Sequence, residues 1–198
     1  MSFRVQDPLT LFSQWLEEAT ATEVNDPNAM ALATLDGDGT LSNRIVLLKG
    51  HDGLGFRFFT NFDGRKGRAL RDNPRAAALF HWKTLDRQVR LEGPVERLSA
   101  EESQAYYDTR ARGSRIGAWA SLQSQPLPNR SALEGRIEEF EARFEGQDQF
   151  AKPDYWGGFI LRPMAMEFWR AGEFRLHERV HLTRPNLDSG WTETPLYP

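Results

Sequence analysis

The sequence has no cysteine among its 198 residues. Disulfide bonds, thiolate nucleophiles and cysteine-ligated metals or clusters are therefore excluded. No apolar run approaches the roughly 20 residues that a membrane-spanning helix requires. The chain starts Met-Ser-Phe-Arg-Val-Gln-Asp, which lacks the apolar centre of a signal peptide. These absences lead us to expect a cytoplasmic protein without a membrane partner.

An excess of positive charge is also absent. The formal net charge is −3, whereas nucleic-acid-binding proteins are usually distinctly basic. We therefore expect no nucleic-acid partner. Basic residues do gather locally, at 65–68 and 110–115. Small anionic ligands would explain these two clusters, and so would an ordinary solvated surface.

Short catalytic motifs are missing as well. The sequence has no glycine-rich dinucleotide fingerprint, no phosphate-binding loop, no His-Glu-x-x-His and no nucleophile elbow. Its four histidines, at positions 51, 81, 177 and 181, do not have the spacing of metal ligands. We therefore expect no metal site.

Aromatic residues and turn signals, in contrast, are plentiful. The 13 Phe, 6 Trp and 4 Tyr supply large buried surfaces for a single domain. Asp7 is a good helix N-cap, Pro8 suits the first helical position, and apolar residues recur on one face up to residue 19. The segment Asp36-Gly37-Asp38-Gly39 predicts a hairpin. The sequence thus begins with a helix that is followed by paired strands.

The remaining pattern predicts a mainly β fold with peripheral helices. We expect strands at 29–35, 43–49, 55–60, 75–82, 87–98, 157–161, 166–169 and 179–183. We expect helices after Asp63-Gly64, from a capping box at Ser99 to about 109, over 114–122, and from a second capping box at Ser131. Gly93-Pro94 indicates a bend in its strand. Hairpin-linked strands with inserted helices predict an antiparallel barrel or sheet rather than a doubly wound fold.

We divide the single domain, 1–198, into four parts. These are an N-terminal helix over 1–28, barrel strands over 29–98, a helical insertion over 99–148 and C-terminal strands over 155–198.

Several segments carry polar groups suited to an anionic ligand. Arg44 and Lys49 enclose four apolar residues. Alternation along a regular strand would place the two cations on opposite faces, unless a bulge or the strand end redirects Lys49. A buried strand with solvated ends is the competing interpretation. Thr60 followed by Arg65 and Lys66 at a predicted helix N-terminus makes a plausible phosphate site.

Uncharged and aromatic groups add to this set. Gln88 lies on a later strand, and Gln123 and Ser124 lie beside a linker. The segment 168–179 contains two aromatic residues at its start, three further arginines and a histidine. On an extended chain Arg175, His177 and Arg179 would share one face.

In this order, the segments resemble the pyridoxamine 5′-phosphate oxidase family, whose members adopt an FMN-binding split β-barrel, a Greek-key antiparallel barrel. The resemblance runs from Asp7-Pro8-Leu9 to about Arg179. Its most specific segments are 44–49, 60–61 with 65–66, 87–89, 116–119 with 123–124, and 168–169 with 175–177. Each segment alone is a weak signal, and five in register are a strong one.

The resemblance implies a role for each matching position. It assigns to FMN Arg44, Ile45, Val46, Leu47, Leu48, Lys49, Phe59, Thr60, Arg65, Lys66, Gln88, Gln123, Ser124, Trp169 and Arg179. It assigns to the substrate Lys49, Tyr106, Arg110, Ser114, Arg175 and His177. Of these, Arg175 and His177 would lie over the substrate ring as catalytic residues. Tyr106 and Arg110 are four residues apart in a predicted helix and so lie on the same face.

The implied activity is oxidation of pyridoxamine 5′-phosphate or pyridoxine 5′-phosphate to pyridoxal 5′-phosphate, with O2 as acceptor and hydrogen peroxide as by-product. The resemblance also implies a homodimer with the flavin at the subunit interface. Two alternatives are a related flavin oxidase of phenazine-type metabolism and a non-catalytic protein that holds FMN or pyridoxal phosphate. The complete set of six substrate residues favours the vitamin B6 substrates.

The resemblance is weaker at both ends of the chain. Family members often have a longer basic N-terminal extension, whereas six residues precede Asp7 here. They commonly end in Arg-Leu-x-Pro, whereas this chain ends Pro195-Leu196-Tyr197-Pro198. Neither a lid nor a C-terminal arginine is therefore carried over.

Overall fold

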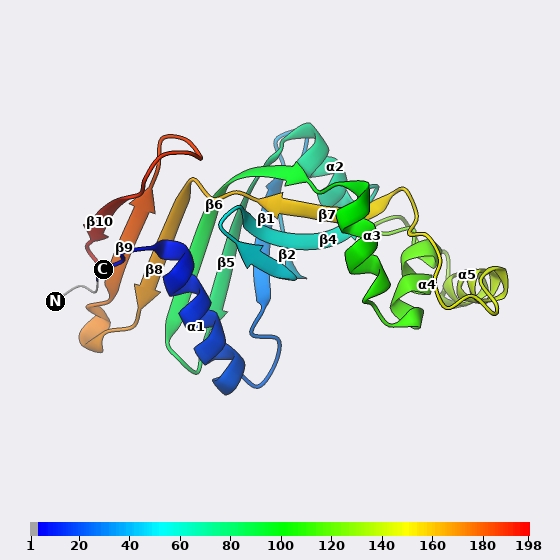
Figure 1. Cartoon of the computed structure of the whole chain (residues 1–198), viewed down its shortest axis with the longest axis horizontal. Helices are drawn as coiled ribbons and strands as arrows, with labels where there is room; N and C mark the ends of the chain where they lie inside the picture. Colours follow the sequence, from blue (N-terminus) through cyan, green and yellow to red (C-terminus); the bar gives the residue numbers. More distant parts are fainter. Residues whose placement is uncertain (1–3) are drawn as a thin grey trace.

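A computed structural model describes residues 4–198, which form ten strands, five α-helices and one short 3₁₀ helix (Figure 1). The helices are α1 (Pro8–Thr22), α2 (Arg65–Asp72), α3 (Ala100–Asp108), α4 (Arg112–Ala120), α5 (Arg130–Arg143) and the 3₁₀ helix η1 (Glu173–Arg175). The strands are β1 (Ala29–Leu35), β2 (Leu41–Leu47), β3 (Gly50–Asp52), β4 (Gly55–Asn61), β5 (Arg75–Trp82), β6 (Arg87–Arg97), β7 (Trp156–Leu161), β8 (Ala165–Arg170), β9 (Glu178–Thr183) and β10 (Thr192–Leu196).

Every strand pairing is antiparallel, as the sequence predicts. The main path of the sheet runs β10-β9-β8-β6-β5-β1-β2, and β7, β4 and β3 continue from the far half of β6. The switch occurs where the sequence predicts a bend, because β6 pairs with β8 up to Glu92 and with β7 from Val95 onward. Gly93 lies between them. A Cβ there would be 2.2 Å from the carbonyl oxygen of Arg162, so only glycine permits this approach.

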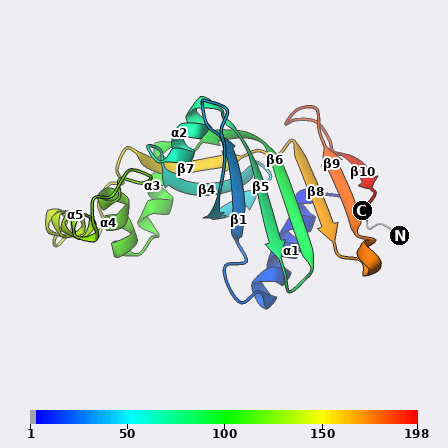
Figure 2. The same cartoon turned by 180° about the vertical axis from the view of Figure 1, so that it is seen from behind.

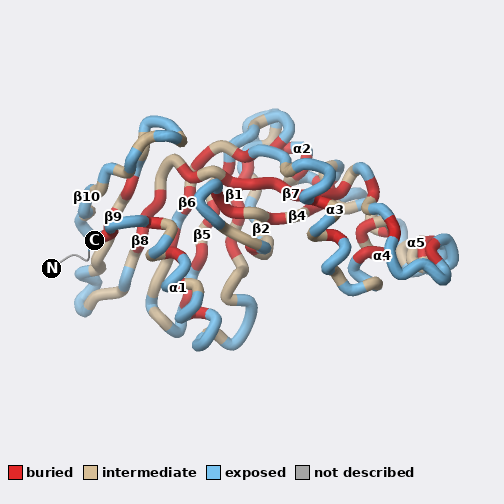
Figure 3. The backbone as a smooth tube through the Cα atoms, viewed as in Figure 1, coloured by how far each residue is buried: buried red, intermediate tan, exposed pale blue. Residues whose placement is uncertain are grey.

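The buried side chains form two hydrophobic clusters. In Figure 3 buried positions recur along the strands of the sheet and again in the inserted helices. The larger cluster fills the barrel under α1, whose Phe12 is fully buried against the rings of Phe56 and Phe80. The smaller cluster joins the inserted helices α3, α4 and α5 to β7, with Tyr107 and Ile116 buried in it. The inserted helices lie at one end of the molecule and β9 and β10 at the other (Figures 1 and 2).

Helix starts follow the expected caps with one exception. The carboxylate of Asp7 accepts a hydrogen bond from the backbone N–H of Thr10, and Ser99 forms the expected capping box. The capping box predicted at Ser131 is wrong. Asn129 caps α5 instead, by accepting from the backbone N–H of Ala132. The glutamate at 134 pairs with Arg130 one turn earlier and so does not reach back to a cap.

The predicted shared face of Arg175, His177 and Arg179 is also wrong. The chain is not extended there, because η1 ends at Arg175 and β9 begins only at Glu178. Phe174 and Arg175 have φ angles of 54° and 65°, in the left-handed region. Two consecutive left-handed residues break the strand alternation on which the prediction depended.

Within residues 4–198, no helix has both the length and the apolar character needed to span a membrane.

Candidate active site

Three cations gather where β2, β4 and the start of α2 meet. We call Arg44, Arg65 and Lys66, with Thr60 and Gln123, the cation cluster. The Lys66 Nζ donates to the Thr60 Oγ1 at 3.2 Å and to the Gln123 Oε1 at 2.9 Å, and Thr60 also donates to that oxygen. The cluster thus joins a barrel strand to the loop after α4.

The arginines of the cation cluster are anchored by the β1–β2 hairpin. The Arg44 guanidinium donates to the Leu32 carbonyl and to the Thr34 Oγ1 at 2.7 Å. The Nε and Nη2 of Arg65 both lie within 2.9 Å of the Asp36 Oδ2. Both guanidinium groups are therefore held at defined positions.

Positive charge in this cluster is only partly compensated. Burial, followed by the charge of Arg44, lowers the pKa of Lys66, and burial, followed by the charge of Arg65, lowers that of Arg44. Among the described residues no carboxylate pairs with Lys66 or Arg44. An anion placed here would relieve the repulsion.

The start of α2 adds to the attraction for an anion. No side chain caps this helix, whose first residues are Arg65 and Lys66. Gly64 precedes it, and a Cβ there would lie 2.5 Å from the Gln123 Oε1. Glycine thus lets the loop after α4 approach a helix N-terminus, where free N–H groups favour a phosphate.

A second cationic site lies at the C-terminal end of α3. The prediction that Tyr106 and Arg110 share one helix face is wrong, because α3 ends at Asp108 and Arg110 lies two residues beyond it. The ring of Tyr106 stacks on Phe59 with centroids 3.9 Å apart, and the Arg110 guanidinium lies 4.8 Å from the centre of the Trp156 ring. The Arg110 Nη1 is buried and has no hydrogen-bond partner among residues 4–198. Burial lowers the pKa of Arg110 and raises that of Tyr106. An unpaired buried guanidinium nitrogen indicates a position for an anionic or carbonyl oxygen.

The two cationic sites use successive residues of β4. Phe59 contacts Tyr106, whereas Thr60 contacts Lys66 and Gln123. Successive strand side chains point to opposite faces. The strand therefore separates two places where a phosphate could bind.

Three other expected residues lie exposed around these sites. Lys49 lies two residues beyond the end of β2, and its backbone N–H donates to the carbonyl of Arg57. Ser114 lies in the first turn of α4, and Ser124 has a φ of 66° in the following loop. The structure gives none of the three side chains a partner within the described chain.

The remaining residues of β2 present an unexpected surface. Ile45 is 65% exposed and lies on a strand at the end of the main sheet path, whereas Leu48 is buried beyond the strand end. Val46 and Leu47 are half-buried. An exposed apolar residue on an unpaired edge indicates a surface that another body covers.

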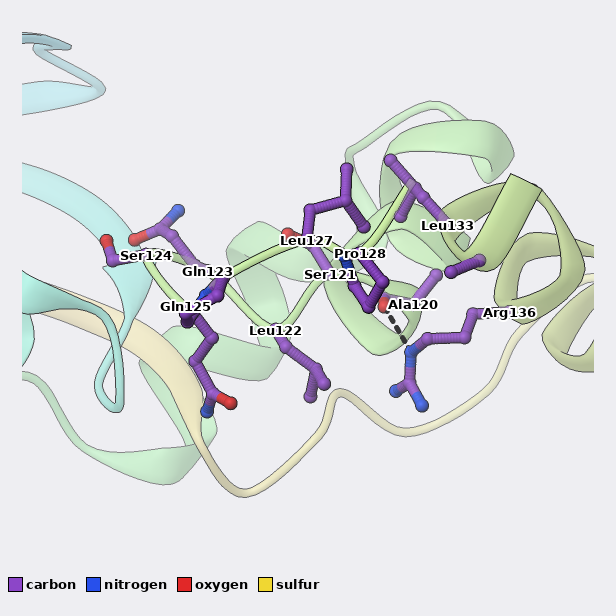
Figure 4. Close-up of a pocket in the computed structure, with 12 residues that line it drawn as sticks. Ala120, Ser121, Leu122, Gln123, Ser124, Gln125, Leu127, Pro128, Leu133 and Arg136 are labelled. Carbon is purple, nitrogen blue, oxygen red and sulfur yellow. Dashed lines mark hydrogen bonds between the residues drawn. The ribbon is translucent and has the colours of Figure 1, made fainter. Parts of the chain in front are cut away.

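Beside the cation cluster, the loop after α4 encloses a cavity of about 420 Å³ (Figure 4). Gln123 and Ser124 lie at one end of it, and Leu133 and Arg136 at the other. The Arg136 Nε donates to the carbonyl of Ala120 at 2.7 Å, which ties α5 to the end of α4.

A third group of expected residues lies across β6, β8 and β9. Gln88 is directly opposite Trp169, which is directly opposite Arg179. We call these three residues the distal row. They line a separate cavity of about 240 Å³ with Arg90, Glu167 and Pro198.

His177 and Arg175 lie next to the distal row. The His177 ring is 4.6 Å from the Trp169 ring, and its Nδ1 accepts from the backbone N–H of Gly172 at 3.3 Å. Arg175 is exposed on the left-handed turn described above. Both residues expected to be catalytic are thus on the C-terminal side of the sheet.

Within one chain the expected site is divided. The cation cluster and Arg110 lie toward the inserted helices, whereas the distal row lies toward β9 (Figure 1). β1 and β5 separate β2 from β6 in the main sheet path. The two groups therefore lie at different places along the sheet.

Two carboxylates near the site were missed by the sequence analysis. Asp36 pairs with Arg65, and the buried Glu167 pairs with Arg90 and Arg179. For Glu167 a signal was present, because it is the lone acid of its strand and lies between the apolar residues Met166 and Phe168. For Asp36, the hairpin turn concealed any further role.

Comparison with known proteins places these observations in one family. The family profile described as pyridoxamine 5′-phosphate oxidase matches residues 16–144. A second profile, described as the pyridoxine 5′-phosphate oxidase C-terminal dimerisation region, matches residues 156–198. The second match implies a homodimer and covers all of β7 to β10.

Curated relatives agree with the profiles. A protein of Rhizobium meliloti named pyridoxine/pyridoxamine 5′-phosphate oxidase is 53% identical, with 97% of this chain and 93% of that protein covered. A protein of the same name from Agrobacterium fabrum is 50% identical with the same coverage.

Solved structures give the same fold. PhzG from Burkholderia lata, in complex with tetrahydrophenazine-1-carboxylic acid, matches with a TM-score of 0.90 and 32% identity, covering 98% of this chain and 94% of that one. An FMN-binding protein of Nostoc punctiforme related to pyridoxamine 5′-phosphate oxidase matches with a TM-score of 0.76 and 15% identity, covering 98% and 100%. The expected split barrel is therefore confirmed. The two profile matches and the curated relatives show that this chain belongs to the pyridoxamine 5′-phosphate oxidase family of oxidoreductases.

Proposed function

We propose that the protein is an FMN-dependent oxidase that converts pyridoxamine 5′-phosphate or pyridoxine 5′-phosphate to pyridoxal 5′-phosphate. The two separate, incompletely compensated cationic sites carry this proposal. The reaction requires one phosphate on the cofactor and another on the substrate, and β4 has such a site on each side.

FMN fits the residues of the cation cluster. Lys66, Arg44 and Arg65, together with the uncapped start of α2, would hold its phosphate. This is one compact site for one phosphate group, which favours FMN over a dinucleotide flavin. Gln123 and Ser124 of the same chain would add neutral hydrogen-bonding groups. The distal row of the second subunit would complete the cofactor site.

The chain's own residues bind and orient the substrate. The unpaired Nη1 of Arg110 would donate to the substrate phosphate, with Tyr106, Ser114 and Lys49 as further donors. Arg175 and His177 of the partner subunit would hold the pyridine ring. Because these groups fix the reacting carbon, their main contribution is orientation rather than proton abstraction.

Bound FMN would supply a hydride acceptor. For the amine, substrate, O2 and water give pyridoxal 5′-phosphate, ammonia and hydrogen peroxide. For the alcohol, substrate and O2 give the aldehyde and hydrogen peroxide. His177 has its Nδ1 occupied by the Gly172 N–H, so its Nε2 is the nitrogen that faces a ligand as a donor.

The test is oxygen consumption by the FMN-reconstituted protein. We expect turnover with pyridoxamine 5′-phosphate, and much slower turnover with unphosphorylated pyridoxamine, because the latter leaves Arg110 without an anion. Yellow protein that binds both FMN and pyridoxamine 5′-phosphate but consumes no oxygen would show a binding protein instead.

A phenazine-type oxidase is the second candidate, because PhzG shares 32% identity and nearly the whole fold. The curated vitamin B6 enzymes, at 53% identity, favour the first. Tetrahydrophenazine-1-carboxylic acid in the same oxygen assay separates the two. Faster turnover with it than with pyridoxamine 5′-phosphate would reverse our assignment.

A further inference from the structure

Glu167 on β8 is a buried acid that the proposed reaction does not use directly. Its side chain is 7% exposed, and both of its oxygens are occupied by arginines. The Oε1 accepts from the Nε of Arg179 at 2.8 Å, and the Oε2 accepts from the Nη1 of Arg90 at 3.2 Å. A buried carboxylate is tolerated only with partners of this kind.

The contact fixes Arg179 at two of its three nitrogens. The Nε is held by Glu167, and the Nη1 donates to the backbone carbonyl of Tyr197 at 3.2 Å. Within residues 4–198 the third nitrogen, Nη2, makes no hydrogen bond. The guanidinium is thus held at its Nε and its Nη1, and its Nη2 keeps free donor hydrogens.

Arg179 lies at a cavity with polar lining residues. Arg179 lines it with Gln88 and Trp169, and Glu167 forms part of its wall. The cavity has a second acid–arginine contact at its margin, where the Nη2 of Arg90 donates to Glu92 at 2.6 Å. Glu92, Arg90, Glu167 and Arg179 therefore alternate in charge across β6, β8 and β9.

We propose that Glu167 is a positioning residue for the cofactor: its carboxylate orients Arg179 so that the free Nη2 donates to bound FMN beside Gln88 and Trp169. The inference rests on the proposed function, because it takes the distal row as part of the FMN site. Glu167 itself touches neither cofactor nor substrate. Its effect on FMN passes through Arg179.

The experiment is titration of the full-length apoprotein with FMN, followed by quenching of FMN fluorescence. Glu167→Leu removes both acceptor oxygens at similar size, and Glu167→Gln keeps one of them. Arg179→Gln removes the guanidinium. Glu92→Gln is the matched control, since it alters an exposed acid that contacts the same Arg90 and not Arg179.

We expect a graded loss. Glu167→Leu should weaken FMN binding about tenfold, the lower end of what loss of a positioning contact costs a bound group. Glu167→Gln should lose less FMN affinity than Glu167→Leu does, and Glu92→Gln should bind FMN as the wild type does. In the double variant Glu167→Leu/Arg179→Gln, the affinity should equal that of Arg179→Gln alone, because Glu167 has nothing left to orient.

Two outcomes overturn different statements. The positioning role would be overturned if the losses of FMN affinity from the two single changes multiplied in the double variant. It would also be overturned if both Glu167 variants bound FMN as the wild type does. Wild-type FMN affinity in Arg179→Gln would instead overturn the placement of the distal row in the cofactor site. If Glu167→Leu does not fold, Glu167→Gln with Arg179→Gln gives the same comparison.

Discussion

Lys66 differs from Arg65, its neighbour in the cation cluster, in having only neutral partners. Thr60 and Gln123 supply oxygen atoms to it, whereas Arg65 has the carboxylate of Asp36. A phosphate would therefore gain more from Lys66 than from a cation that is already paired. This difference can be tested at single residues.

Lys66→Met should weaken FMN binding by roughly tenfold to a hundredfold, because a hydrogen bond to a charged group contributes about 1.5–3 kcal/mol. The measurement is an FMN titration of the apoprotein. Arg71→Met, in the last turn of the same helix and paired with Asp72, is the control and should bind as the wild type does. Equal affinities of the two variants would contradict the phosphate site.

FMN affinity should also fall at alkaline pH. Burial and Arg44 lower the pKa of Lys66 below its ordinary value of 10.5, and a bound phosphate favours the charged form and raises it again. The affinity for FMN is therefore highest below the pKa that Lys66 has in the FMN-free protein, and it declines as the pH rises through that pKa. Dissociation constants measured from about pH 7 to about pH 10 should show this decline. In Lys66→Met that decline should disappear; its persistence there would assign it to another group.

Arg110 and the pair Arg175 and His177 should separate in steady-state kinetics. Arg110→Ala should mainly raise KM, since a remote phosphate contact stabilises ground and transition states alike. Arg175→Ala and His177→Ala should also lower kcat, because they misplace the reacting carbon. All three should retain FMN. Rapid-mixing experiments measure how fast pyridoxamine 5′-phosphate reduces the bound FMN. A wild-type rate in Arg175→Ala and His177→Ala would mean that the active site lies elsewhere.

At the scale of elements, sequence patterns predicted what local forces decide. Strands β1 and β5 were predicted to the residue, and the bend of β6 at Gly93 was expected from its glycine and proline. β10 was missed because it contains Pro195, which is tolerated on an edge strand but weakens the strand signal. The left-handed pair Phe174 and Arg175 was missed because neither residue type favours that conformation.

The candidate site was predictable as a set of residues but not as an arrangement. Which residues bind which group stays a prediction from the resemblance. The structure shows that Lys66 and Gln123 meet, although 57 positions separate them in the sequence. Pairs such as Arg65 with Asp36 depend on how the hairpin packs against α2, which no local pattern encodes. The division of the site into two groups follows from strand order, which is likewise a non-local property.

The edge strand β2 provides a prediction for assembly. Ile45→Asp should convert the dimer to a species near the 22.7 kDa of one chain, because a charge at an apolar interface is costly to bury. Light scattering measures the change. Val24→Asp is the control, since Val24 is 89% exposed in the loop after α1. A dimer that survives Ile45→Asp would show that β2 lies outside the interface.

At the scale of the whole molecule, a site divided between two copies should permit complementation. Lys66→Met and His177→Ala damage opposite halves of the proposed site. Each homodimer should therefore be weak, whereas a mixed dimer has one site with both halves intact. Random mixing makes half of the dimers mixed, each with one good site in two, so activity should recover to about a quarter of the wild type.

The measurement is oxygen consumption after the two variants are unfolded together and refolded. Variants refolded separately and then combined without exchange are the control and should remain weak. No recovery, with mixed dimers verified by tagged chains, would mean that each chain builds its own site.

The two hydrophobic clusters have a consequence for how the molecule loses function. They share no buried residue. Tyr106 packs against the smaller, helical cluster and Arg110 lies over its Trp156, whereas Lys66 is on α2, whose Leu70 belongs to the larger cluster. Separate clusters are natural units of partial opening, with their own free energies. When the helical unit opens, the grip on the substrate is lost while most contacts to the cofactor persist. Opening of the helical unit alone would thus leave a flavin carrier without a substrate, whereas opening of the barrel would release the flavin as well.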